Sequence, residues 1–353
     1  MKLLHVVGAR PNFPKLAPVY RAGAAAGATQ YVVHTGQHYD DALSASFFRD
    51  LGIREPDINL EVGSSSHAAQ TARIMERFEP VLIEQAPDWV VVYGDVNSTA
   101  AAALVAAKLS TRIAHVEAGL RSNDRSMPEE INRLVTDRLA NLLLAPSHDA
   151  IENLRCEGEP EDEIAFVGNV MIDTLCYTLE LARKTGFRES LGVGRDAVVV
   201  TLHRPSNVDD PARLAAIAGS LREIARERPV VFAVHPRTTH RLEAAGISLG
   251  DVRVLPPVRY VEMLDLVDGA YAVITDSGGL QEETTALGVP CLTVRENTER
   301  PVTVTEGTNR LVPNPNDLVD AARSIERPTH PKRPDGWDGF AGERAIAALL
   351  ARK

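Results

Sequence analysis

The stretch that decides the fold is LLHVV-GARPNFPK-LAPVYRAGAAA, residues 3–26. Its first five residues form a short apolar run that is typical of a buried strand. Pro14 suits the first turn of a helix, and the alanine-rich run over residues 16–26 favours that helix. A strand, a polar loop and a helix in this order form half of a βαβ unit, which predicts parallel strand pairing.

The same alternation continues along the chain and restarts after residue 196. Alternating strands and helices place helices on both faces of a parallel sheet, so we predict two doubly wound, Rossmann-like α/β domains. They should span residues 1–175 and 176–335, and a C-terminal helix within 336–353 should pack back on the first domain. Strands are expected at residues 3–7, 30–33, 89–93, 112–116, 142–144, 197–202, 230–234, 252–254, 272–275 and 290–293. Helices are expected at residues 16–26, 40–51, 64–84, 98–109, 129–138, 213–228, 261–267, 279–287, 317–324 and 343–351.

Composition excludes several classes of protein. The chain has 353 residues, of which 44% are hydrophobic and 24% charged, and its net charge is −10. Such a surface repels nucleic acid, and no apolar run is long enough to span a membrane. The apolar run at residues 3–7 is too short for a signal peptide, so we expect a cytoplasmic protein. The three cysteines, Cys156, Cys176 and Cys291, form no CxxC cluster and are expected to be reduced packing residues.

The loop after the first predicted strand carries two cations, Arg10 and Lys15. It matches neither a Walker A loop nor GxGxxG, but a strand-to-helix loop already favours an anion. We therefore predict that both side chains face the phosphates of a nucleotide, against the simpler reading of two solvated cations. A G-x-G-x-x-A match at residues 192–197 is rejected as a dinucleotide site because it precedes a strand.

Three carboxylates follow later strands of the first half. Asp95 follows the strand at 89–93, Glu117 follows the strand at 112–116, and Glu129 begins the next helix. Taken one at a time, each carboxylate can be explained as a helix cap or as an acidic residue in the first turn of a helix. Together they should converge at one sheet edge, and paired carboxylates are usual equipment for general acid/base chemistry.

The second half places cations and a glycine pair after its strands. His203 and Arg204 follow its first strand, where they could contact a phosphate or, for His203, pack in the core. The strand at 272–275 leads into DSGGLQEE, in which Ser277 can cap a helix while Gly278 and Gly279 allow a ligand to approach closely. Further polar groups with possible ligand roles are His235, Glu283 and Arg300. No HExxH motif is present, and we expect no metal ion.

Ten short blocks, in this order, resemble the non-hydrolysing UDP-N-acetylglucosamine 2-epimerase family. They are GARPNFPKLAPV (8–19), TGQHYD (35–40), YGDVNSTAAA (93–102), HVEAGLRS (115–122), PEEINR (128–133), GNVMIDT (168–174), TLHRPSN (201–207), HPR (235–237), TDSGGLQEET (275–284) and RENTERP (295–301). The resemblance implies two Rossmann-like domains of the glycosyltransferase-B type with the active site in an interdomain cleft. It also implies interconversion of UDP-GlcNAc and UDP-ManNAc without a cofactor, by a protein that is usually a homodimer.

The resemblance also implies roles for individual residues. Catalytic roles fall on Asp95, Glu117, Glu129 and His203, and UDP or substrate binding on Arg10, Lys15, Arg121, His235, Ser277, Gly278, Gly279, Glu283 and Arg300. Gln37, His38, Arg73 and Arg204 fall near positions that bind a second, activating UDP-GlcNAc in some members. Two blocks depart from the usual pattern: HRPSN replaces HRREN, and GARPNFPKLAPV replaces GTRPEAIKMAPV.

The expected reaction eliminates UDP from C1, gives a 2-acetamidoglucal and adds UDP back with C2 inverted. Such a reaction needs cations on the leaving pyrophosphate and acid/base groups on opposite ring faces. Other readings remain open: a hydrolysing epimerase, an epimerase of another UDP-2-acetamido sugar, a glycosyltransferase of the same fold, or a catalytically silent UDP-sugar sensor. A Rossmann dehydrogenase is disfavoured by the misplaced glycine motif.

Overall fold

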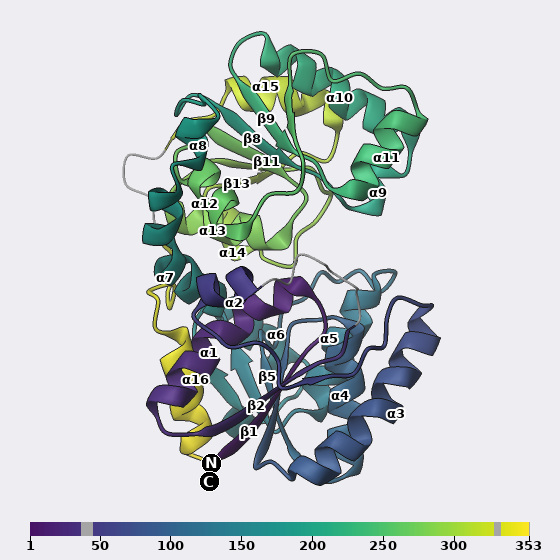
Figure 1. Cartoon of the computed structure of the whole chain (residues 1–353), viewed down its shortest axis with the longest axis vertical. Coiled ribbons are helices and arrows are strands. Elements are labelled where there is room, and N and C mark those ends of the chain that lie inside the picture. The colour runs from purple at the N-terminus through teal and green to yellow at the C-terminus, as the bar shows by residue number, and fades with distance from the viewer. Residues whose placement is uncertain (37–44, 328–332, 353) are drawn as a thin grey trace. The chain divides into compact units, whose positions relative to one another are not determined.

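The computed structural model describes residues 1–36, 45–327 and 333–352. The chain divides into two compact units. Unit 1 comprises Met1–Tyr177 and Asp335–Lys353, and unit 2 comprises Thr178–Pro334. Each unit is built around one parallel sheet (Figure 1).

Unit 1 contains a seven-stranded sheet in the order β3-β2-β1-β4-β5-β6-β7, and all its strand pairs are parallel. The helix α7 (Val170–Thr185) leads from unit 1 into unit 2. The strands of unit 1 are β1 (Lys2–Val7), β2 (Thr29–His34), β3 (Ile58–Asn59), β4 (Trp89–Tyr93), β5 (Arg112–Val116), β6 (Leu142–Ala145) and β7 (Ile164–Phe166). Its helices are η1 (Arg10–Asn12), α1 (Phe13–Ala25), α2 (Ala45–Leu51), α3 (His67–Gln85), α4 (Asn97–Lys108), α5 (Pro128–Leu139), α6 (His148–Cys156), η2 (Glu161–Glu163) and α16 (Ala341–Leu350).

Unit 2 contains a six-stranded parallel sheet in the order β10-β9-β8-β11-β12-β13. Its strands are β8 (Val198–Thr201), β9 (Val230–Ala233), β10 (Arg253–Leu255), β11 (Ala272–Thr275), β12 (Cys291–Thr293) and β13 (Asn309–Leu311). Its helices are α8 (Phe187–Ser190), α9 (Pro205–Val208), α10 (Pro211–Ala225), α11 (Pro236–Ala244), α12 (Tyr260–Asp268), α13 (Gly278–Leu287), α14 (Val302–Thr305), η3 (Pro315–Asp317) and α15 (Leu318–Arg323).

Both sheets are buried on two faces, which explains why their central strands are continuous apolar runs. Every residue of β4 (WVVVY) is buried, and β6 (LLLA) is buried throughout. The alanine-rich α4 packs closely on the unit 1 sheet because three successive alanines, residues 101–103, lie in the core. The small side chains therefore bring the helix backbone near the strands.

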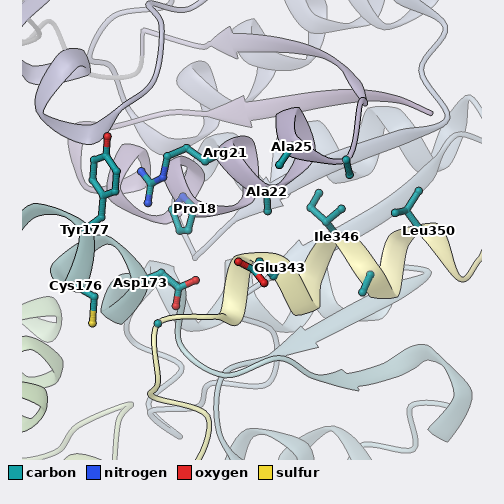
Figure 2. A pocket seen from close by; sticks show the side chains of 13 residues that line it. Pro18, Arg21, Ala22, Ala25, Asp173, Cys176, Tyr177, Glu343, Ile346 and Leu350 are labelled. Atoms are coloured by element: carbon teal, nitrogen blue, oxygen red, sulfur yellow. The ribbon is translucent and has the colours of Figure 1, made fainter.

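The C-terminal helix α16 belongs to unit 1 and packs against α1 (Figure 1). The Asp173 carboxylate on α7 accepts hydrogen bonds from the first backbone N–H groups of α16, those of Ala341 and Gly342 (3.1 and 2.7 Å). Beside these helices lies a cavity of about 720 Å³, and Figure 2 shows Arg21 and Tyr177 at one end of it. No candidate site residue lines this cavity.

Several elements differ from the sequence-based expectations. The helix α1 begins at Phe13 rather than residue 16, with Pro14 in its first turn. Three short strands, β3, β7 and β13, were not expected at all. Cys156 and Cys176 are exposed and only Cys291 is buried, so the prediction that all three pack in the interior is wrong. Within the described ranges, no helix is both long and apolar enough to cross a membrane.

Candidate active site

In each unit, the strand order reverses between two neighbouring strands, and several predicted site residues follow those strands, among them Lys15, Asp95, His203 and Ser277. In unit 1, β1 lies between β2 and β4, so the loops after β1 and β4 meet at the reversal. In unit 2, β8 and β11 are the corresponding pair. Open α/β sheets bind ligands outside the carboxyl ends of strands at such points.

Lys15 and Glu117 form a buried ion pair in unit 1. Lys15 lies in the first turns of α1, and the loop that leads to it is held by Asn12. The Asn12 side chain accepts hydrogen bonds from the backbone N–H groups of Gly8 and Ala9 (3.2 and 3.0 Å) and donates one to the Tyr93 carbonyl (3.0 Å). The loops after β1 and β4 are therefore joined directly beside this ion pair.

Asp95 pairs with a cation rather than capping a helix. Its carboxylate forms an ion pair with Arg133 on α5, and its backbone carbonyl accepts a hydrogen bond from Asn132 (2.8 Å). The N-cap of α4 is Val96, which makes no side-chain cap, and Asn97 lies inside the helix. The capping explanation for Asp95 is therefore wrong, and α5 holds this carboxylate in place.

The two neighbouring glutamates at the start of α5 have different surroundings. Glu130 is buried, accepts hydrogen bonds from the backbone N–H groups of Ser122 and Asn123, and pairs with Arg133. Burial alone would raise the pKa of Glu130, but these N–H groups and Arg133 lower it below its ordinary value. Glu129 is exposed and has no ion pair or hydrogen bond within the described part of the chain. Hydrogen bonds join the loops that carry Asp95 and Glu117, whereas among the described residues no hydrogen bond or ion pair joins Glu129 to either carboxylate.

Glu117 adopts a left-handed backbone conformation, with φ of 73°. For a residue other than glycine this conformation costs about 1–2 kcal/mol, which the surrounding structure must offset. Gly94 lies directly beside it. A Cβ atom added to Gly94 would lie 2.7 Å from Lys15 Nζ and 3.2 Å from Glu117 Oε2. Only a residue without a side chain leaves room there for the ion pair.

Arg121 forms ion pairs with two carboxylates of unit 1. Its guanidinium contacts Asp137 (2.7 Å) and Glu157 (2.6 Å), and the side chain is buried. These contacts hold the loop after β5 in place, and the contact of Arg121 with substrate stays a prediction.

In unit 2, His203 is an exposed side chain oriented by a buried carboxylate. Its Nδ1 lies 2.9 Å from Asp276 Oδ1, and its side chain is 44% exposed, so it is not a packed core histidine. Asp276 also accepts hydrogen bonds from the backbone N–H groups of His203 and Arg204. Burial would raise the pKa of Asp276, but His203 and these N–H groups lower it, so a carboxylate faces Nδ1. Nδ1 is then the donor, and Nε2 is the nitrogen left to meet a ligand.

An ion-paired arginine, Arg300, lies beside the N-terminus of α13. Ser277 occupies the N-cap position with extended backbone, but its hydroxyl makes no capping bond. Arg300 contacts Glu299 (2.5 Å) and Glu282 (2.9 Å), and a Cβ on Gly278 would lie 2.5 Å from the Arg300 guanidinium. Glu299 also pairs with Arg295 (2.7 Å). The glycine thus lets a guanidinium approach the positive end of a helix, a combination suited to phosphate.

Glu283, also on α13, is buried and accepts a hydrogen bond from the Tyr260 hydroxyl (2.9 Å). Burial raises the pKa of Glu283 to about 7, and the neighbouring carboxylate of Glu282 adds to the rise. Its ordinary value is 4.5, so the folded chain binds this proton more tightly than the unfolded chain does. The contribution to stability therefore declines as the pH rises from about 4.5 to about 7.

We expect Glu283→Gln to remove this pH dependence. Glutamine keeps the shape and the acceptor for Tyr260 but cannot ionise. Relative to the unchanged protein, the variant should gain stability as the pH rises from 5 to 8. Calorimetry of both proteins at several pH values measures this difference, and a difference that does not vary with pH would contradict the titration.

The remaining candidates lie in varied surroundings. Arg10 places its guanidinium 5.2 Å from the centre of the Phe47 ring. Arg204 donates to the Asp276 carbonyl (3.1 Å), and the rings of His235 and His203 are 5.9 Å apart. Arg73 is exposed on α3, Gly279 lies in the first turn of α13, and Gln37 and His38 fall outside the described residues. The predicted activator site therefore stays a prediction.

Sequence reasoning missed four acidic residues that hold the candidates in place: Glu130, Asp137, Asp276 and Glu299. Asp276 lies inside the quoted TDSGGL block, and its position at the end of a strand beside His203 was the available signal. Nothing in the sequence pairs Asp137 with His115, which precedes it by 22 residues. Among the described residues, no group of three or more His, Cys, Asp or Glu side chains could hold a metal ion.

The chain is similar to known proteins over its whole length. A family model described as UDP-N-acetylglucosamine 2-epimerase matches residues 22–350. A UDP-N-acetylglucosamine 2-epimerase from Methanocaldococcus jannaschii is 41% identical over 366 residues, covering 100% of both chains. A UDP-2,3-diacetamido-2,3-dideoxy-D-glucuronate 2-epimerase from Pseudomonas aeruginosa is 40% identical over 364 residues, also covering 100% of both.

One solved structure allows the folds to be compared directly. The crystal structure of Methanocaldococcus jannaschii UDP-GlcNAc 2-epimerase in complex with UDP-GlcNAc and UDP matches with a TM-score of 0.91 at 40% identity, covering 100% of both chains. The predicted fold class, α/β with two parallel sheets in a two-domain chain of the glycosyltransferase-B type, is confirmed.

Proposed function

The chain belongs to the UDP-N-acetylglucosamine 2-epimerase family, and we propose that it interconverts UDP-GlcNAc and UDP-ManNAc without releasing the free sugar. The observation that carries the proposal is a pair of ion-paired carboxylates on neighbouring loops of unit 1. Asp95, paired with Arg133, follows β4 where the strand order reverses, and Glu117, which follows the adjacent strand β5, pairs with Lys15 after β1. These are acid/base groups placed where an open α/β sheet takes its ligand.

Unit 2 supplies groups suited to a UDP leaving group. The N–H groups at the start of α13, the Arg300 guanidinium and the His203 imidazole can stabilise negative charge that develops on a pyrophosphate. Asp276 keeps the His203 ring oriented before the ligand arrives. Glu283 has the acceptor oxygens that ribose hydroxyls require.

The proposed reaction begins with departure of UDP from C1 of the sugar. The C2 proton is not acidic in the ground state, but oxocarbenium character at C1 makes it removable. A carboxylate of unit 1 accepts this proton, which leaves 2-acetamidoglucal and bound UDP. UDP then adds back to C1 while a second acid/base group protonates C2 from the opposite face, so that C2 is inverted and every atom is conserved.

His203→Ala should weaken UDP binding by about tenfold to a hundredfold, because a hydrogen bond to a charged group contributes about 1.5–3 kcal/mol. The melting temperature should fall only slightly, because the buried Asp276 loses the imidazole but keeps hydrogen bonds from the backbone N–H groups of residues 203 and 204 and from Asn207. Titration calorimetry with UDP measures the affinity, and His240→Ala, an exposed histidine on α11, is the matched control. Unchanged affinity and turnover would remove His203 from the site.

A second substrate is favoured by one comparison. The Pseudomonas aeruginosa relative named for UDP-2,3-diacetamido-2,3-dideoxy-D-glucuronate is 40% identical, against 41% for the relative named for UDP-GlcNAc. Both sugars carry the 2-acetamido group and the C2 proton on which the proposed chemistry depends. Parallel assays at equal concentrations would decide between them through the ratio of kcat/KM.

Product analysis tests the proposed function. NMR of UDP-GlcNAc incubated with the purified protein should show UDP-ManNAc approaching equilibrium with its precursor. Stoichiometric free ManNAc and UDP would indicate a hydrolysing enzyme instead. No reaction without an added sugar acceptor, followed by transfer when one is supplied, would indicate a glycosyltransferase.

A further inference from the structure

The segment that carries Glu117 is fixed at several points on both sides of it. The Ala118 N–H donates to the Leu144 carbonyl (3.2 Å). Gly119 has φ of 83°, and a Cβ there would lie 2.3 Å from the Ala150 carbonyl oxygen. Of the two backbone positions just after Glu117, the first is therefore hydrogen-bonded to β6 and the second is packed closely against α6. The left-handed conformation of Glu117 itself needs comparable support, because a non-glycine residue leaves that region when it is released.

Asp137, on α5, forms hydrogen bonds with residues on both sides of Glu117. Its Oδ1 lies 2.5 Å from Nδ1 of His115, two residues before Glu117. Its Oδ2 accepts a hydrogen bond from the Gly119 N–H (3.0 Å), two residues after Glu117. Asp137 and His115 are 1% and 0% exposed. One buried carboxylate thus bridges the two ends of the segment over residues 115–119.

His115 extends this support to the neighbouring loop. Its Nε2 donates to the Gly94 carbonyl (2.8 Å), and the Gly94 N–H donates to the Val116 carbonyl (3.0 Å). Gly94 lies against the ion pair of Lys15 and Glu117 and immediately precedes Asp95. A displacement of His115 would therefore move the surroundings of both carboxylates.

The charge of Asp137 is balanced within the same cluster. Burial would raise its pKa, but His115 and Arg121 lower it below the ordinary value. Arg121 reaches Asp137 at 2.7 Å and is itself held by Glu157. Arg121 therefore helps to hold the Asp137 carboxylate in position.

We propose that Asp137 is a positioning residue for the epimerisation, acting through His115 and the Gly119 N–H to hold Glu117 and the loop of Asp95 in reacting geometry. The inference rests on the proposed function. Asp137 touches none of the reacting groups itself, and its effect is on where Glu117 lies. Misplacement of a reacting group by about 1 Å can lower a rate about a hundredfold, so the expected effect falls on kcat.

Two substitutions of Asp137 separate geometry from charge. Asn can accept from Gly119 and Arg121 through Oδ1 and donate through Nδ2 to His115 Nδ1, when the ring carries its proton on Nε2. The bond from His115 to Gly94 survives, so Asp137→Asn should keep kcat within about fivefold. Asp137→Ala removes the bonds to His115 and Gly119 and the contact with Arg121, and it should lower kcat about tenfold to a hundredfold. UDP affinity should stay unchanged, because within the described residues no hydrogen bond or ion pair joins Asp137 to Arg10, to Lys15 or to the groups of unit 2 that are proposed to bind UDP.

A double-mutant cycle with Glu117→Gln tests whether Asp137 acts through Glu117. On the Glu117→Gln background, Asp137→Ala should lower kcat by a clearly smaller factor than on the unchanged background. The part of its effect that acts through Glu117 is then absent, and only the part that acts on the loop of Asp95 remains. His115→Phe keeps the ring volume, breaks the link to Gly94 and should repeat this pattern. If Asp137→Ala does not fold, His115→Phe tests the same inference. Arg138→Ala, the adjacent exposed residue of α5, is the control and should leave kcat unchanged.

Three results would overturn the inference. The first is wild-type kcat in Asp137→Ala or His115→Phe. The second is an Asp137→Ala substitution that lowers kcat by the same factor in the unchanged protein and in Glu117→Gln, which would indicate a general structural role. The third is an Asp137→Asn variant as slow as Asp137→Ala. Failure of the proposed function is separate, because the unchanged protein would then not epimerise UDP-GlcNAc at all.

Discussion

Asp95→Asn, Glu117→Gln and Glu129→Gln should each lower turnover of UDP-GlcNAc by about 10²- to 10⁴-fold, the range typical of acid/base groups. Each substitution keeps the side-chain shape and removes the ability to exchange a proton. UDP affinity should change little, because the carboxylates are proposed to act on the sugar. Steady-state kinetics and UDP titration on the same preparations separate the two effects.

The three positions differ in what else the substitution disturbs. Glu117→Gln leaves Lys15 without its carboxylate, and Asp95→Asn does the same to Arg133. Glu129 is exposed and unpaired in the described chain, so Glu129→Gln should leave the melting temperature unchanged. Glu84→Gln, an exposed glutamate on α3, is the control. Near-normal turnover in all three variants would contradict the proposed mechanism.

Lys15→Met should destabilise unit 1 by about 3–5 kcal/mol, because it leaves the buried Glu117 carboxylate without its cation. Adding Glu117→Gln removes that isolated charge. The double variant should therefore recover much of the lost stability, although it stays inactive.

Tryptophan fluorescence can measure the stability of unit 1 separately. The chain contains two tryptophans, Trp89 and Trp337, and both belong to unit 1. Denaturant unfolding monitored by their emission therefore reports on the unit that holds the ion pair. A double variant no more stable than Lys15→Met would show that the ion pair is not what stabilises this region.

The central strands were predictable because each is a continuous apolar run between polar loops. The runs at residues 89–93, 112–116 and 272–275 became β4, β5 and β11 with the expected bounds. The missed strands lie at or near sheet edges and are short. Two of them, Ile58–Asn59 and Asn309–Leu311, carry too few apolar residues to stand out. Their pairing partners, rather than their own propensity, determine them.

Helix ends were predictable only where the capping chemistry was local. The helix expected at residues 64–84 begins at His67, because the Ser66 hydroxyl accepts from the Ala69 N–H (3.4 Å). The start of α13 fell within one residue of its expectation, since a strand and a glycine pair define it. The short helix α9 went unexpected because its four residues present no periodic pattern.

The sequence indicated which residues are candidates for the site, but not which side chains form ion pairs with them. Strand ends in the sequence located Asp95, Glu117 and His203. The partners that orient them, Arg133 and Asp276, come from other elements, and only the folded chain brings them together. Arg121 is a further example, because the sequence did not show that this cation pairs with Asp137 and Glu157.

The most direct test of the proposed elimination and re-addition is NMR of UDP-GlcNAc incubated with the unchanged protein in D₂O. Removal of the C2 proton and protonation from solvent predict that deuterium enters UDP-ManNAc at C2 and at no other carbon. The same label should appear in recovered UDP-GlcNAc as the reaction approaches equilibrium. UDP-ManNAc formed with its original C2 proton retained, or with deuterium at another carbon, would contradict this mechanism.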